Sequence, residues 1–427
     1  MTLCVLTLLT ACDSDKHSQW QIAGDRIRTP WAEQVNPDNV LPEYPRPQLR
    51  RCEWQNLNGL WQYALTEKGL PEPASWDGEI LVPFAIESAL SGVGRVPTDK
   101  QELWYRREFT VPRSWRSRRV MINFGAVDWR AEVYVNGALA GVHEGGYTPF
   151  SVDATPFLRH GRQVLTLRVY DSTDQGYQPR GKQVSRPRSI WYTSVTGIWQ
   201  TVWMEPVNDN HITAVLPVAD IDRSLLNVTV QTSADSHDVA YVTLLEDGRQ
   251  VAAGCGVAGQ NIVLHVQNAK LWSPDSPFLY DMKVTLKRGE KKMDEVLSYA
   301  AMRKISRIKD AQGHWRMQLN NRTLFQYGPL DQGWWPDGLY TAPTDEALRF
   351  DIQKTKDLGF NMIRKHVKVE PARWYYHCDR LGMLVWQDMP SGDMGNEWEP
   401  REFMGGTDRD RTEESAANYY REWQEIM

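Results

Sequence analysis

The spacing of apolar residues changes near residue 305, and this change constrains the fold more than any other feature of the sequence. Before it, short runs of β-branched and aromatic residues alternate with polar ones between Gly, Pro and Asn, which is typical of antiparallel strands. After it, short apolar runs alternate with segments of helical periodicity, an order that implies parallel strands joined by helices. We therefore predict β-sandwiches followed by β-α repeats.

The first β block is predicted to form an all-β sandwich over residues 20–207. Residues 131–135 alternate and lead into Asn136-Gly137, a pair that suits a type I′ hairpin turn because both positions take positive φ. Residues 164–170 and 199–203 alternate in the same way. Since a buried indole is the usual state in such strands, we expect core positions rather than ligand contacts for four tryptophans: Trp104, Trp199, Trp203 and Trp272.

Residues 208–304 form a second β block of about five to seven short strands with turns every 8 to 12 residues, which predicts an immunoglobulin-like sandwich. The predicted strands are residues 226–230, 239–245, 262–266 and 280–286. No cysteine pair is available to bridge them, because the scattered Cys52, Cys255 and Cys378 lack both CxxC spacing and histidines at metal-site intervals. We interpret these three as core thiols, with no disulfide framework and no zinc.

The third part, residues 305–427, is predicted to contain three βα units. Strands are expected at residues 324–327, 360–364 and 383–387, with helices beginning at Thr344 and Pro371, ending near Gly359 and Gly382, and a last helix over 413–427. Parallel strands with helical crossovers form either a doubly wound sheet or a closed eight-stranded barrel. A barrel takes about 250 residues, so this part corresponds to about half of one.

Net charge and the beginning of the chain limit the partners. With 49 basic and 54 acidic residues the net charge is −5, which argues against a nucleic-acid partner. Residues 1–9 are largely apolar and are followed by Thr10-Ala11-Cys12 and then polar residues, so residues 1–19 are predicted to be a leader. A lipid-modified Cys12 would make the protein an exported envelope protein whose only membrane contact is that anchor; an ordinary cleaved leader or a chance apolar run are the alternatives.

Seven strings, in order along the chain, resemble glycoside hydrolase family 2, which includes β-galactosidases, β-glucuronidases and β-mannosidases. They are Val82-Pro-Phe-Ala-Ile-Glu-Ser88, Leu103-Trp-Tyr-Arg-Arg-Glu-Phe109, Gly125-Ala-Val-Asp-Trp-Arg-Ala-Glu-Val-Tyr-Val-Asn-Gly137, Gly197-Ile-Trp-Gln-Thr-Val-Trp203, Leu271-Trp-Ser-Pro-Asp-Ser-Pro-Phe-Leu-Tyr280, Asp357-Leu-Gly-Phe-Asn-Met-Ile-Arg364 and Cys378-Asp-Arg-Leu-Gly-Met-Leu-Val385. The resemblance implies a sugar-binding-like jelly roll that braces the barrel, an immunoglobulin-like sandwich, and the N-terminal part of a (β/α)8 TIM barrel.

The resemblance also implies exo-acting hydrolysis of O-glycosyl bonds by retaining double displacement, which uses two carboxyl groups about 5 to 5.5 Å apart. In the family these are glutamates at the ends of barrel strands four and seven, so neither has a counterpart in this chain. Asn396-Glu397 follows strand three and only imitates the motif. We therefore expect residues 1–427 alone to be inactive. The rival interpretations are a non-catalytic carbohydrate-binding envelope protein and the product of a prematurely terminated pseudogene.

The candidate substrate-binding residues follow the three predicted barrel strands, because ligands of such barrels bind at the carboxyl ends of the strands. Substrate contact is predicted for Asp331, Trp335, His366 and Asp388, with loop capping, ion pairing or, for Trp335, packing as the alternatives. Arg364-Lys365-His366 departs from the family's usual Arg-Thr-Ser-His-Tyr-Pro. A basic cluster of Lys365, His366 and Lys368 would suit a uronic acid or be a solvated strand end. A glycoside or oligosaccharide is the expected partner, no cofactor or metal is implied, and the sugar and the oligomeric state stay open.

Overall fold

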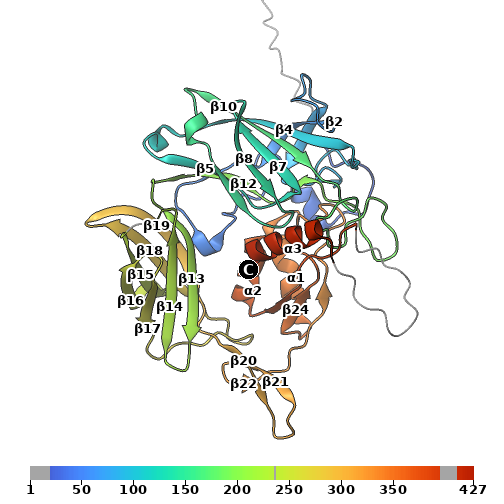
Figure 1. The fold of residues 1–427 in the computed structure, drawn as a ribbon. Coiled ribbons are helices and arrows are strands. Elements are labelled where there is room, and N and C mark those ends of the chain that lie inside the picture. Colours follow the sequence, from blue (N-terminus) through green and yellow to red (C-terminus); the bar gives the residue numbers. More distant parts are fainter. Residues whose placement is uncertain (1–19, 235–236, 395–410) are drawn as a thin grey trace, which may run out of the picture.

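The computed structural model describes residues 20–234, 237–394 and 411–427. Cys12 and the Asn396-Glu397 pair lie outside these described residues. The chain forms two β-sandwiches, a projecting hairpin and a segment of parallel strands and helices (Figure 1). Among the described helices, none combines the length and the apolar character that crossing a bilayer requires.

The first domain packs a four-stranded antiparallel sheet against a six-stranded one, and its core lies between the two. The four-stranded sheet has the order β1 (Gln55–Asn56), β12 (Val202–Val207), β5 (Arg119–Phe124) and β9 (Phe150–Asp153). The six-stranded sheet has the order β3 (Gly78–Val82), β2 (Gly59–Glu67), β4 (Gln101–Thr110), β10 (Arg162–Tyr170), β7 (Arg130–Val135) and β8 (Ala138–Glu144). A short pair joins β6 (Val127–Asp128) to β11 (Gly197–Ile198).

Local sequence signals account for much of this domain. Asn136 and Gly137 have φ of 52° and 83° and connect β7 to β8, which confirms the predicted hairpin. Trp199 is buried as predicted, but it lies outside any strand, because the strand expected over residues 199–203 begins only at Val202. The other three tryptophans assigned to cores are also buried: Trp104, Trp203 and Trp272.

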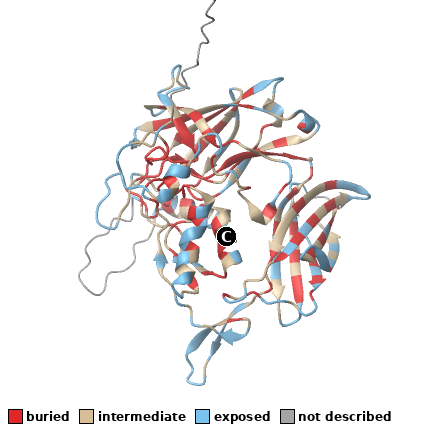
Figure 2. Ribbon diagram, turned by 180° about the vertical axis from the view of Figure 1, so that it is seen from behind, coloured by how far each residue is buried: buried red, intermediate tan, exposed pale blue. Residues whose placement is uncertain are grey.

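The second domain is a seven-stranded sandwich of immunoglobulin-like type. One sheet has the order β13 (Ile212–Asp220), β14 (Leu225–Thr232) and β17 (Asn261–His265). The other has the order β16 (Arg249–Val257), β15 (Val239–Glu246), β18 (Tyr280–Arg288) and β19 (Lys291–Ala300). Buried positions alternate with exposed ones along these strands (Figure 2). Cys255 and also Cys52 are exposed, so the core-thiol interpretation is wrong for both and right only for Cys378.

Arg51 joins the two sandwiches. Its side chain is 6% exposed and forms ion pairs with Glu205 of β12 and with Asp294 of β19. Its Nη2 also donates a hydrogen bond to the carbonyl of Ile212 over 2.7 Å. A buried arginine needs such partners, since an unpaired charge in a protein interior is costly. Arg51 therefore binds both domains at once, next to the backbone pairing of Arg50 with Leu297.

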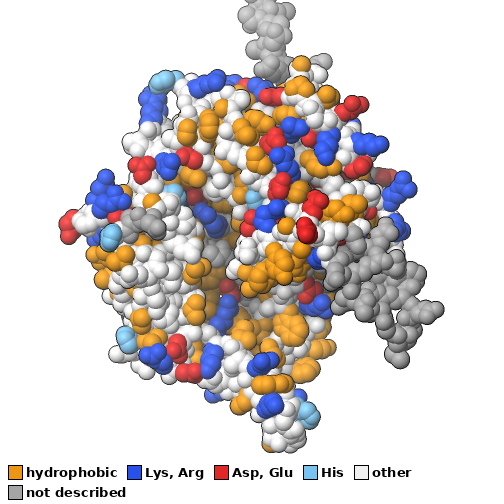
Figure 3. Space-filling view, in the orientation of Figure 1, with side chains coloured by type: hydrophobic (Ala, Val, Ile, Leu, Met, Phe, Trp, Pro, Cys, Tyr) orange, Lys and Arg blue, Asp and Glu red, His pale blue; other side chains and the backbone are white. Residues whose placement is uncertain are grey.

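A small three-stranded antiparallel sheet, which we call the projecting hairpin, extends from the molecule after the second domain (Figure 1). It consists of β20 (Ile305–Lys309), β21 (Trp315–Leu319) and β22 (Arg322–Thr323). Four large apolar side chains of β20 and β21 are exposed: Ile305, Ile308, Trp315 and Met317. The space-filling view also shows apolar side chains over this hairpin and over the neighbouring region that contains β24 (Figure 3).

The last part, which we call the βα segment, contains three parallel strands in the order β23 (Leu330–Asp331), β24 (Met362–Lys365) and β25 (Leu384–Gln387). Its helices are α1 (Asp345–Asp357), α2 (Ala372–Leu381) and α3 (Glu413–Ile426). The predicted helix starts are confirmed, because the Thr344 hydroxyl accepts from the Ala347 amide and Pro371 directly precedes α2. The predicted first strand was wrong: residues 324–327 lie before β23, which begins only at Leu330.

Helix α3 lies against the first domain (Figure 1). The indole of Trp129 donates to Glu422 Oε1 over 2.9 Å, and the Thr148 hydroxyl donates to Glu425 Oε2 over 2.7 Å. Glu422 is fully buried. The helix therefore ties the end of the described chain back to the sandwich that precedes it by more than two hundred residues.

Candidate functional site

The carboxyl ends of the three parallel strands lie level with one another. Asp331 pairs in register with Lys365, and Lys365 with Gln387. Two hydrogen bonds continue the ladder beyond the strands, from the His366 amide to the Asp331 carbonyl (2.8 Å) and from the Asp388 amide to the Lys365 carbonyl (3.0 Å). Residues that directly follow these strands are therefore neighbours, as the sequence predicts.

Successive side chains of β24 point to opposite faces of the sheet. Ile363 packs in the core formed with α1 and α2, so Lys365, two residues later, also points to the helix side. Arg364 points the other way and is 48% exposed. The site thus has a buried cluster on the helix side and an accessible cluster on the open side.

The open-side cluster consists of Arg364, His366 and Asp388. The guanidinium of Arg364 binds both carboxylate oxygens of Asp388, with Nε 3.0 Å from Oδ1 and Nη2 2.9 Å from Oδ2. His366 Nδ1 lies 2.8 Å from the same Oδ2. Burial alone would raise the pKa of Asp388, but the hydrogen bonds with Arg364 and His366 outweigh it and lower that pKa. Asp388 is therefore held as a carboxylate, and the His366 contact leaves Nε2 on the far side of the ring.

The helix-side cluster consists of two lysines and two carboxylates. Lys365 Nζ lies 2.7 Å from Asp331 Oδ2 and 2.8 Å from Glu370 Oε1, and Lys368 Nζ lies 2.9 Å from the same Glu370 oxygen. Both lysine side chains are 1% exposed. They stack on aromatic rings, Lys365 over Trp374 and Lys368 over Tyr340.

Burial lowers the pKa of both lysines, but the net shift differs because their partners differ. For Lys365, burial lowers the pKa, but the two carboxylates outweigh it and the pKa is raised. For Lys368, burial prevails over the attraction of Glu370 and lowers the pKa to about 8. Both lysines are buried, so the interpretation as a solvated strand end is wrong for Lys365 and Lys368. The preference for a uronic acid stays a prediction.

The four predicted substrate-contact residues therefore occupy different environments. His366 and Asp388 share the open-side cluster. Asp331 points to the helix side as the partner of Lys365. Trp335 is 8% exposed and packs in the core beside α1, with its ring edge-on to Trp31 at 6.1 Å; its position corresponds to the packing alternative.

Sequence reasoning missed two residues that organise the site. They are Arg364, for which the sequence predicts no contact with substrate, and Glu370, which belongs to no motif. The spacing Lys365-x-x-Lys368-x-Glu370 is the signal that could have pointed to the buried cluster. For Arg364, the signal is its single-residue offset from the buried Ile363 in a four-residue strand.

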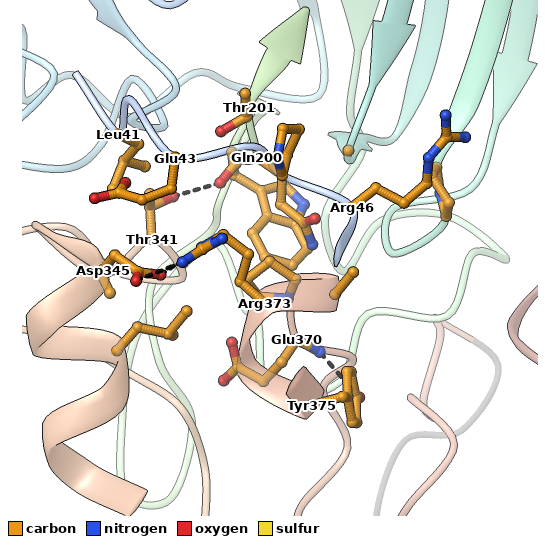
Figure 4. Close-up of a pocket in the computed structure, with 18 of the residues that line it drawn as sticks. Leu41, Glu43, Arg46, Gln200, Thr201, Thr341, Asp345, Glu370, Arg373 and Tyr375 are labelled. Atoms are coloured by element: carbon orange, nitrogen blue, oxygen red, sulfur yellow. Dashed lines mark hydrogen bonds and ion pairs between the residues drawn. The ribbon is translucent and has the colours of Figure 1, made fainter. Parts of the chain in front are cut away.

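A separate cavity of about 320 Å³ lies between the first domain and the beginnings of α1 and α2 (Figure 4). Its wall includes Trp199, Tyr340 and Glu370. Arg373 of α2 spans it to bind Asp345 of α1, with Nε 2.6 Å from Oδ1. The cavity lies on the helix side, behind the Lys365–Glu370 pair, and is distinct from the open-side cluster.

Comparison with known proteins gives a consistent picture of both sandwiches. The model described as "Glycosyl hydrolases family 2, sugar binding domain" matches residues 54–204, and the model "Glycosyl hydrolases family 2" matches residues 206–303. Together these matches cover more than half of the chain.

Individual relatives are glycosidases that are longer than this chain. A β-galactosidase from Thermoanaerobacter pseudethanolicus is 26% identical over 306 residues, 67% of this chain and 39% of the relative. A β-glucuronidase from Formosa agariphila is 27% identical over 332 residues, 70% of this chain and 33% of the relative. The structure of a β-glucuronidase from Ruminococcus gnavus superposes with a TM-score of 0.68 at 20% identity, covering 83% of this chain and 62% of that one. The chain therefore spans less than half the length of the β-galactosidase and the β-glucuronidase matched by sequence.

Proposed function

Since this chain belongs to glycosyl hydrolases family 2, we propose that it takes part in the hydrolysis of O-glycosyl bonds by an exo-acting β-glycosidase, and that β23, β24 and β25 are the first three strands of the catalytic (β/α)8 barrel. The carboxyl ends of such strands form the substrate-binding mouth. The sandwiches would then brace this mouth from the side.

The observation that carries the proposal is the half-buried cluster of Arg364, His366 and Asp388 on the open side of the strand ends. A carboxylate with a lowered pKa accepts hydrogen bonds from sugar hydroxyls, and an imidazole nitrogen exchanges one with a neighbouring hydroxyl. Because Arg364 binds Asp388 in two-pronged fashion, the carboxylate is oriented before a ligand arrives. We assign hydroxyl recognition to Asp388 and His366, with Arg364 as a positioning residue.

Chemistry in this proposal needs one carboxylate that attacks the anomeric carbon and one carboxylic acid that protonates the leaving oxygen, after which water releases the sugar. The resemblance places both on strands beyond β25, so residues 1–427 alone should bind sugar without cleaving it. Incubation with p-nitrophenyl β-D-galactoside and β-D-glucuronide should release no nitrophenol. Turnover by the purified 427-residue chain would contradict this division of roles.

Binding is tested with saturation-transfer NMR on methyl β-D-galactoside and methyl β-D-glucuronide. Asp388→Asn should abolish the transfer signal, because one of the two acceptor oxygens is replaced by an NH2 donor and the negative charge is lost. The matched control is Asp310→Asn, since Asp310 also binds an arginine (Arg316, 2.7 Å) and lies near a histidine (His314, 3.7 Å), but on the projecting hairpin. Equal signals from both variants and the unmodified chain would overturn the proposal.

We also propose that the protein is exported and anchored to the cell envelope through a lipid on Cys12. The support is the apolar run that ends in Leu9-Thr10-Ala11-Cys12 and is followed at once by polar residues. Metabolic labelling with a radioactive fatty acid should mark the protein and should fail in Cys12→Ser. Labelling that persists in that variant would exclude this anchor.

A further inference from the structure

Residues 180–192 of the first domain form a loop whose two ends are hydrogen-bonded to each other. The Val184 amide donates to the Tyr192 carbonyl, and the Tyr192 amide donates to the Lys182 carbonyl, each over 2.9 Å. Between these ends residues 185–190 are all exposed. The 180–192 loop therefore presents its tip to solvent from a fixed base.

The base of this loop touches the segments that follow all three parallel strands. Tyr192 packs against Trp334, after β23, with ring centroids 4.6 Å apart. The Gly181 amide donates to the Ser391 carbonyl, after β25, over 2.9 Å. Gly181 also lies against Val367, after β24, so closely that an added Cβ would be 2.5 Å from the Val367 carbonyl oxygen. The loop is thus part of the rim around the strand ends.

The charge of the loop is of one sign. It carries Arg180, Lys182, Arg186 and Arg188, and no Asp or Glu occurs between residues 175 and 204. Arg180 and Lys182 lie over the ring of Trp191, at 5.2 and 5.6 Å from its centroid, and Asp174 lies 3.9 Å from Arg180. At the exposed tip, Arg186 and Arg188 form no ion pair with the described residues.

We propose that the 180–192 loop binds anionic sugar units of the glycan chain that extends out of the strand-end site, through Arg186 and Arg188. This inference rests on the proposed function, since it takes the strand ends as the place where the terminal sugar is held. A guanidinium fits the paired oxygens of a carboxylate or a sulfate, and the rim position puts the arginines beyond the terminal sugar. The substrate class is therefore an acidic oligosaccharide, recognised on the side of the leaving group.

The test measures binding of three probes to the 427-residue chain by isothermal calorimetry: trigalacturonate, a sulfated carrageenan tetrasaccharide, and neutral galactotriose. Both acidic probes should bind more tightly than the neutral one, and their binding should weaken when NaCl is raised, because salt screens exposed charges. Arg186→Ser/Arg188→Ser should weaken acidic binding about fivefold, as expected for two exposed ion pairs. Arg249→Ser/Arg322→Ser removes the same charge from exposed positions on β16 and β22 and should change nothing.

The outcomes test the 180–192 loop independently of the strand-end site. Preference for only one acidic probe would identify carboxylate or sulfate as the bound group and would support the inference. Equal binding of acidic and neutral probes, no binding of either acidic probe, or equal losses in the two double variants would overturn it. None of these results depends on the NMR experiment with Asp388→Asn and the methyl glycosides. If that variant kept the full transfer signal, the proposed function would be overturned instead.

Discussion

Arg364 and Asp388 link the carboxyl ends of β24 and β25 through three hydrogen bonds of 2.9 to 3.1 Å. Because the pair is only partly buried, its recognition role and its contribution to stability are separable. An exposed ion pair contributes about 1 kcal/mol or less to folding, whereas loss of an oriented acceptor removes a ligand contact outright.

The pH dependence of this pair follows from the lowered pKa of Asp388. A carboxyl whose pKa is lower in the folded state stabilises the fold above its unfolded pKa of about 3.9, and this contribution is lost as pH falls through the folded value. We expect Asp388→Asn to cost about 1 kcal/mol at pH 7 and nothing near pH 2. Urea unfolding at both pH values measures this, and a cost independent of pH would contradict the ionic origin.

Lys365 is expected to matter far more for stability than an exposed lysine. Lys365→Met removes the cation that binds both the partly buried Asp331 and the buried Glu370, and breaking a buried pair in this way costs about 3 to 5 kcal/mol. Lys283→Met is the control, because Lys283 forms an exposed pair with Glu295 and should cost about 1 kcal/mol or less. Denaturant unfolding followed by tryptophan fluorescence gives both values; similar costs would show that the buried cluster is not the stabilising element.

Docking of α3 should weaken as pH rises. Burial raises the pKa of Glu422 to about 7, although the Trp129 indole and Arg421 act in the opposite direction. An acid with a raised folded pKa binds its proton more tightly when docked, so stability is full below the unfolded pKa of about 4.3 and falls until pH exceeds about 7. The difference between these two pKa values corresponds to about 4 kcal/mol.

Hydrogen exchange of the α3 amides at pH 5 and pH 8, corrected for intrinsic exchange, measures this effect. Glu422→Gln should remove most of the pH dependence, while Glu414→Gln, at an exposed position of the same helix, should retain it. Protection that stays constant from pH 5 to pH 8 in the unmodified chain would show that Glu422 is not protonated on docking.

Substitution of Gly181 is predicted to destabilise the fold for two reasons that can be measured separately. Its φ is +60°, and a side chain would also meet the Val367 carbonyl oxygen. Gly248→Ala provides the comparison, because Gly248 has φ of +77° but nothing within 4 Å of an added Cβ. We expect about 1 kcal/mol for Gly248→Ala and about 2 kcal/mol more for Gly181→Ala, measured by thermal unfolding; equal costs would exclude the steric contact.

Features set by neighbouring residues could be predicted from the sequence. The Asn136-Gly137 turn, the Thr344 cap and the left-handed Gly382 at the end of α2 each depend on the chemistry of a few adjacent positions. The level ends of the parallel strands also followed, since their order along the chain implies it.

Features set by which face of a strand is covered could not be predicted. In the four-residue strand β24, a shift of one residue exchanges the open side for the helix side, and this decided that Lys365 is buried while Arg364 is accessible. The partners of Asp331 and Trp335 depend on how α1 and α2 pack, which no local pattern specifies. The 180–192 loop has no periodicity, and its four cations do not by themselves indicate that it lies beside the strand ends.

The arrangement around Arg51 determines how the molecule responds to heat. One buried guanidinium binds Glu205 in the first domain and Asp294 in the second, so separating the sandwiches would break at least one of these two buried ion pairs. We expect neither sandwich to melt while the other stays intact. Calorimetry should record one shared transition for both, and Arg51→Met should split it into two.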